Sequence, residues 1–136
     1  MTHSLDTSAL LAHYLAEPGA ERVQALFEDE AVVPGVSILS LYEFEWRLHQ
    51  LGVNAANRTT ELNRYRALLN EVVVVDEAVR SEAIRLRTSA TAHVAAMDIL
   101  IAATASLKSA TLVHRDPHFA AIPGSLLKQE VLPAKR

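Results

Sequence analysis

Residues 95–117 read AAMDILIAATASLKSATLVHRDP, and this stretch decides the predicted fold. Its first part, Ala95 to Leu107, is apolar almost all round, which predicts a helix buried in the core. Residues Thr111 to His114 are predicted to form a strand, and Asp116-Pro117 then opens a short helical turn. The stretch therefore places a buried helix, a strand and an acidic turn in direct succession.

Outward from this stretch, the chain alternates between helices and strands. We expect helices at about 7–16, 20–29, 38–51, 55–70 and from Asp76 to about 87, and strands at about 3–5, 31–33, 72–75 and 126–131. The unbroken apolar run Val72 to Val75 suggests a strand buried on both faces, as in parallel sheets. Strands separated by helices predict an α/β fold, a three-layer α/β/α sandwich with a mainly parallel central sheet and right-handed crossovers.

Length and composition narrow the class of protein. With 136 residues, 50% of them hydrophobic, and no linker or repeat, we expect a single domain over residues 1–136. No apolar run approaches the roughly 18 residues of a membrane span and MTHSLD does not resemble a signal peptide, so we expect a cytoplasmic protein without membrane association. The absence of cysteine excludes thiolate ligands, so any metal must bind oxygen or imidazole.

The charge pattern gives little support for general binding of nucleic acid. The net charge is −3, so RNA would have to bind at a local site. Six arginines lie close together in the sequence: Arg58, Arg64, Arg66, Arg80, Arg85 and Arg87. Because acids are interleaved with them, a solvated surface of mixed charge is favoured over a dedicated RNA patch.

Two acids follow predicted strands. Asp6 ends the first strand, and Asp116 comes just after the strand at 111–114. Ligands of open parallel sheets bind outside the carboxyl ends of the strands, which suits a functional role. Asp is also a preferred N-cap residue, and for either acid alone the two interpretations are equally weighted.

Two further acids lie within predicted helices. Asp98 is the only acid between Glu82 and Asp116, and burying it unpaired would cost several kcal/mol or raise its pKa. A functional role is therefore favoured over a cap at the helix start. For Glu43, taken alone, an ion pair with Arg47 one turn later is favoured over a role in a site.

Four segments together resemble the PIN-domain family. They are LDTSALL (5–11), VSILSLYE (36–43), MDILIAATA (97–105) and TLVHRDPHF (111–119), in the order and at roughly the spacing of PIN domains. The resemblance implies that Asp6, Glu43, Asp98 and Asp116 converge on one acidic pocket that binds Mg²⁺ or Mn²⁺, with Ser8 supporting it by hydrogen bonds. Such a cluster needs a cation to offset its repulsion, and hard divalent ions take oxygen ligands.

The similarity to VapC-like PIN proteins also implies an activity. It implies a metal-dependent endoribonuclease that leaves 5′-phosphate and 3′-hydroxyl ends, acting as the toxin of a type II toxin–antitoxin pair. Such toxins form homodimers and are silenced by a cognate antitoxin whose tail covers the acidic pocket. Three alternatives carry less weight than this one. The first is a housekeeping PIN nuclease of RNA maturation, the second a non-catalytic interaction module, and the last a phosphoaspartate enzyme.

The chain departs from the PIN pattern at two histidines. His114 stands where PIN domains often have Thr or Ser, and His118 where they often have a further acid. A structural role is favoured for both over contact with phosphate. Whether Arg115 steers RNA stays open at this point.

Overall fold

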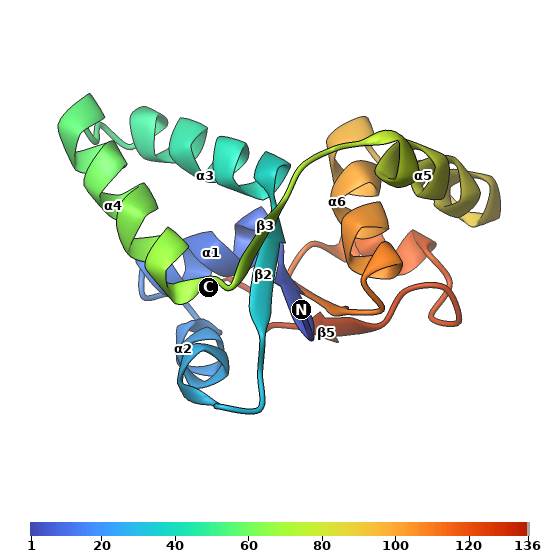
Figure 1. Ribbon diagram of the computed structural model, residues 1–136, viewed down its shortest axis with the longest axis horizontal. Helices are drawn as coiled ribbons and strands as arrows, with labels where there is room; N and C mark the ends of the chain where they lie inside the picture. The colour runs from blue at the N-terminus through green and yellow to red at the C-terminus, as the bar shows by residue number, and fades with distance from the viewer. Residues whose placement is uncertain (136) are drawn as a thin grey trace.

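The computed structural model describes residues 1–135, and strands and helices alternate along them (Figure 1). In chain order the elements are β1 (His3–Leu5), α1 (Thr7–Tyr14), α2 (Ala20–Glu28), β2 (Pro34–Ser37), α3 (Ile38–Gln50), α4 (Ala55–Leu68), β3 (Glu71–Val73), α5 (Glu77–Ser89), α6 (Ala96–Leu107), β4 (Thr111–His114), the 3₁₀ helix η1 (Pro117–Ala121) and β5 (Gln129–Val131). None of the helices within residues 1–135 has the length and hydrophobicity of a membrane span.

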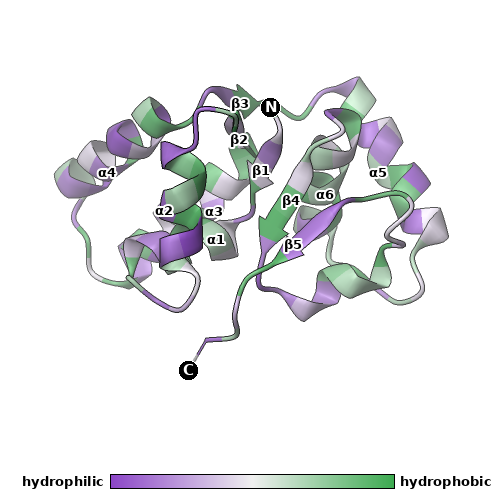
Figure 2. Ribbon diagram, turned by 90° about the horizontal axis from the view of Figure 1, so that it is seen from below, coloured by the Kyte–Doolittle hydropathy of each residue, from purple (hydrophilic) through white to green (hydrophobic). Residues whose placement is uncertain are grey.

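The strands form one parallel sheet with the order β3-β2-β1-β4-β5. Helices α1 to α4 cover one face and α5 and α6 the other, as Figure 2 shows from below. Neighbouring residues of β4 show the layering, because side chains alternate between the two faces of a strand. Val113 belongs to the core beneath α1 to α4, and Leu112 belongs to the core beneath α5 and α6. The predicted three-layer α/β/α sandwich with a parallel sheet is confirmed.

The predicted strand at residues 31–33 is wrong, because the strand begins at Pro34. Asp29 holds the preceding residues in a turn: its carboxylate accepts the Ala31 N–H at 2.9 Å and its carbonyl accepts the Val32 N–H at 3.0 Å. Proline lacks a backbone donor but fits the first position of a strand. Pro34 therefore opens β2, where the sequence pattern suggested that it ends a strand.

The expectation that residues 72–75 are buried on both faces is also wrong. β3 covers only Glu71 to Val73 and lies at an edge of the sheet. Val74 and Val75 lie beyond it and are 63% and 40% exposed. An apolar run does not distinguish a central strand from an edge strand, since that depends on pairing with distant segments. The predicted strand at 126–131 is confirmed as β5, which occupies the last three residues of that range and lies at the other edge of the sheet.

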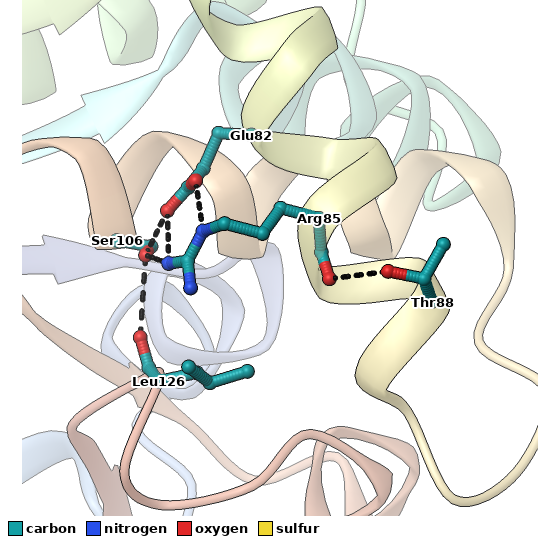
Figure 3. Close-up of polar contacts among 5 residues, drawn as sticks. All are labelled: Glu82, Arg85, Thr88, Ser106 and Leu126. Atoms are coloured by element: carbon teal, nitrogen blue, oxygen red, sulfur yellow. Dashed lines mark hydrogen bonds and ion pairs between the residues drawn. The ribbon is translucent and has the colours of Figure 1, made fainter.

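The predicted buried helix is confirmed as α6, whose residues 101–105 are all buried. A polar network at its carboxyl end ties it to α5 (Figure 3). Arg85 forms a two-point ion pair with Glu82 at 2.6 and 2.7 Å. The Ser106 hydroxyl lies within hydrogen-bonding distance of both the Glu82 carboxylate and the Leu126 carbonyl. The network thus joins α5, α6 and the segment that leads into β5.

Candidate active site

The fold brings the four predicted acids to the carboxyl ends of three neighbouring strands, β2, β1 and β4. Asp6 directly follows β1, and Asp116 follows β4 by two residues. Glu43 lies on α3, which continues from β2, and Asp98 lies in the first turn of α6. In Figure 1, α3 and α6 begin in the upper half of the molecule, on either side of the sheet. Each acid is close enough to another for their charges to interact.

Asp6 is buried and caps helix α1. Its Oδ2 accepts the Ser8 backbone N–H at 3.1 Å and the Ser8 hydroxyl at 2.6 Å. Burial raises the pKa of Asp6, the two Ser8 hydrogen bonds oppose the rise, and the nearby Asp98 charge adds to it. The capping interpretation is therefore realised in the structure, but it uses only one of the two carboxylate oxygens.

Asp116 caps η1, and the buried His114 helps to place it. Oδ1 of Asp116 accepts the His118 N–H at 2.9 Å and lies 2.9 Å from His118 Nδ1. The Asp116 N–H donates to His114 Nδ1 at 3.0 Å, and His114 Nε2 is 2.8 Å from the Gln129 side-chain oxygen. His114 is thus a buried structural residue, as favoured from the sequence, whereas the His118 side chain is 72% exposed beside Asp116.

Glu43 is not paired with Arg47, the interaction favoured from sequence for this acid alone. Its Oε1 instead accepts the Thr7 hydroxyl at 2.7 Å, and Arg47 lies 3.4 Å from the Gln50 side-chain oxygen. Burial raises the pKa of Glu43, the Thr7 hydrogen bond opposes this, and the charges of Asp6 and Asp116 raise it further. Sequence reasoning missed Thr7, although it is the middle residue of the DTS triplet that contains Asp6 and Ser8.

Asp98 does not cap α6, because the N-cap position is Ala95. Its carboxylate accepts no hydrogen bond from residues 1–135, and its position in the first turn lets the helix N-terminus favour a negative charge. Burial raises the pKa of Asp98, and the charges of Asp116 and Glu43 raise it further. An acid without donors, near two other acids, is in an environment that favours a bound cation.

Comparison with known protein families matches residues 4–125 to the PIN domain. The chain belongs to the PIN-domain family. A search of curated proteins found no match.

Solved structures of similar fold include toxin–antitoxin complexes. VapBC2 of Rickettsia felis, bound to a DNA fragment from its promoter, is 20% identical with a TM-score of 0.77, over 98% of this chain and 100% of that one. FitAcB of Neisseria gonorrhoeae is 25% identical with a TM-score of 0.71, over 94% and 96% of the two chains. VapBC-1 of nontypeable Haemophilus influenzae is 19% identical with a TM-score of 0.74, over 96% and 98%.

PIN domains generally bind divalent metal, and the oxygens of this one fit such an ion. Oδ1 of Asp6, Oε2 of Glu43, Oδ2 of Asp116 and both oxygens of Asp98 accept no hydrogen bond within the described part of the chain. No three acidic or histidine side chains there stand close enough to hold one ion together. The set therefore fits a cation that touches one or two carboxylates and keeps several waters, as Mg²⁺ does.

The clustered arginines of this PIN domain form a surface of mixed charge, in line with the sequence analysis. Four of the six pair with acids: Arg58 with Glu45, Arg64 with Glu61, Arg80 with Glu77 and Arg85 with Glu82. Arg87 instead donates to the Val94 carbonyl at 2.5 Å. These contacts give no separate reason to assign the arginines to RNA.

Proposed function

We propose that this PIN domain, acting as a single domain over residues 1–136, is a metal-dependent endoribonuclease and the toxin of a type II toxin–antitoxin pair. The observation that carries the proposal is the arrangement of Asp6, Glu43, Asp98 and Asp116. They interact through their charges at adjacent strand ends, and each keeps an oxygen without a donor among residues 1–135. Families of PIN domains are typically nucleases, which agrees with this arrangement.

Asp6, Glu43, Asp98 and Asp116 would hold Mg²⁺ or Mn²⁺, partly through water. When bound, such an ion supplies an acidified water and stabilises negative charge at the phosphorus of the scissile bond. The protein itself keeps the acids oriented: Ser8 holds Asp6 and Thr7 holds Glu43. Hydrolysis of the RNA phosphodiester would then leave 5′-phosphate and 3′-hydroxyl ends.

The proposed partners are an RNA substrate, a second copy of the chain and a cognate antitoxin, all meeting in the cytoplasm. The similar structures from Rickettsia felis and Neisseria gonorrhoeae are of VapBC2 and FitAcB, which supports a partner protein for this chain. A group of acids carrying unshared oxygens would attract a basic side chain from such a partner, because arginine–carboxylate hydrogen bonds are strong. The same group of acids would thus serve both catalysis and inhibition.

The activity is tested with purified, partner-free protein and total cellular RNA, with Mg²⁺, with Mn²⁺ and with chelator. We expect discrete fragments that require the metal, and we expect Asp98→Asn to abolish them while circular dichroism stays unchanged. Asp29→Asn is the matched control, because Asp29 lies in the turn that leads into β2, at the amino ends of the strands, and the four acids lie at the carboxyl ends. Absence of cleavage with either metal, or equal cleavage by Asp98→Asn, would rule out this function.

A further inference from the structure

Arg115 lies between His114 and Asp116, yet its side chain turns away from the four acids. Its guanidinium donates to the Glu17 carboxylate at 2.5 Å and to the Pro18 carbonyl at 3.3 Å. Both partners belong to the turn between α1 and α2. The Arg115 and Glu17 side chains are only 11% and 16% exposed. The pair therefore ties the segment next to Asp116 to the turn between α1 and α2, with little access to solvent.

The backbone of Arg115 takes part in the site. Its N–H donates to the Ser8 hydroxyl at 3.1 Å, and that hydroxyl in turn donates to Asp6 Oδ2 at 2.6 Å. One residue therefore joins the turn after α1, the serine that supports Asp6 and the loop that carries Asp116. Movement of residue 115 would disturb two of the four acids together.

Glu17 is held in its ionised form by two cations. Burial alone would raise the pKa of Glu17, but hydrogen bonds from Arg115 and Lys135 outweigh it and lower the pKa. Lys135 Nζ lies 3.2 Å from Glu17 Oε2, on the opposite oxygen from Arg115. The Arg115 guanidinium is engaged by the Glu17 carboxylate and the Pro18 carbonyl and is only 11% exposed, which leaves little of it to contact an RNA phosphate.

We propose that Glu17 and Arg115 are positioning residues, whose ion pair holds the loop of Asp116 and the Ser8–Asp6 hydrogen bond in place for divalent-metal binding. This inference rests on the proposed function. Residues that orient metal ligands commonly change metal affinity by about 10- to 100-fold when they are removed. Arg115 accordingly acts through the acids and not by contact with RNA.

The test compares Arg115→Gln, Glu17→Gln and the conservative Arg115→Lys with wild type. Arg22→Gln is the control, because the Arg22–Glu130 ion pair, with hydrogen bonds at 2.8 and 3.0 Å, also joins distant segments, here 108 positions apart. The Glu17–Arg115 contact joins residues 98 positions apart. Mn²⁺ affinity is measured by electron paramagnetic resonance on the folded fraction, and exchange of the residue 115 amide proton by nuclear magnetic resonance.

We expect Arg115→Gln and Glu17→Gln to weaken Mn²⁺ binding by about 10-fold and to speed exchange of the residue 115 amide. Arg115→Lys should recover part of both, and Arg22→Gln should change neither. A purely structural ion pair would lower the melting temperature but leave the Mn²⁺ affinity of folded molecules unchanged, and that result would overturn the proposal. If Arg115→Gln does not fold, the Mn²⁺ affinities of Arg115→Lys and Glu17→Gln test the proposal.

A second measurement separates positioning from contact with RNA. RNA binding is followed against salt concentration in the Asp98→Asn background, where cleavage is absent. We expect Arg115→Gln to leave the salt dependence unchanged, whereas loss of a phosphate contact would reduce the logarithmic slope by about 0.7 and would refute our assignment. If wild type binds Mn²⁺ but cuts no RNA, the proposed function fails. The Mn²⁺ affinities of the variants then still show whether Glu17 and Arg115 position the metal site. If wild type binds no Mn²⁺, both proposals fail.

Discussion

Replacing Asp98 by Asn should stabilise the metal-free protein, although it should abolish RNA cleavage. The Asp98 carboxylate accepts no hydrogen bond from any residue up to Lys135, so the substitution removes a charge without breaking such a contact. Burial and the charges of Asp116 and Glu43 raise the pKa of Asp98. The folded protein therefore disfavours the ionised form of this group relative to the unfolded chain.

The expected gain in stability of Asp98→Asn follows from the charges of its acidic neighbours. Two unit charges about 4 Å apart repel by about 1 kcal/mol in water and by about 4 kcal/mol near a protein surface. Because Asp98 is only partly buried and the nearby His118 opposes the rise, the low value of about 1 kcal/mol applies to each of its two acidic neighbours. Asparagine gives up the attraction of the α6 N-terminus, which is worth up to about 1 kcal/mol. A net gain of about 1 kcal/mol remains, or about 4 °C in melting temperature.

The pH dependence has a defined sign. Between the ordinary pKa of an aspartate and the raised pKa of Asp98, the folded state binds more protons than the unfolded state, so the free energy of unfolding of wild type falls as the pH rises. Asparagine does not titrate, so the advantage of Asp98→Asn should be absent near pH 3 and fully developed above the raised pKa.

Urea unfolding in chelator, at several pH values, measures this difference. Added Mn²⁺ should then make wild type more stable than Asp98→Asn, since a ligand stabilises only the folded protein that binds it. Destabilisation of metal-free Asp98→Asn at pH 8 would refute the argument, because it would mean that the carboxylate is held by favourable contacts and not repelled by its neighbours.

Two further substitutions test the site and the core separately. Thr7→Val removes the hydroxyl that donates to Glu43, so we expect RNA cleavage to fall by about 10-fold with a loss of stability near 1 kcal/mol, and unchanged rates would show that Glu43 needs no such support. Phe44 is fully buried, with its ring centroid 5.0 Å from that of Tyr65. Phe44→Ala should therefore lower the free energy of unfolding by about 3–5 kcal/mol in guanidinium titration, and a loss below about 1 kcal/mol would be incompatible with this packing.

Features that depend on neighbouring residues were predictable from the sequence. The continuous apolar character of residues 95–107 was enough to identify a buried helix, because burial on all sides requires apolar side chains on all sides. Ser37 and Asp76 cap α3 and α5, and such caps can be predicted from the sequence because a cap is a contact between residues two or three positions apart. The four acids were identified through the segments around them, which the PIN-domain resemblance joined into one expected site.

Features that depend on distant contacts were decided only by the tertiary structure. The position of β3 at an edge depends on which strands pair, and an apolar run is the same in either place. Glu43 has Arg47 one turn along its own helix, but it bonds Thr7, which the sheet brings close from 36 positions away. Arg115 likewise finds Glu17 across 98 positions. Local spacing specified which side chains were available, and packing of the strands and helices selected their partners, because a buried polar group must take the partner that the fold places within reach.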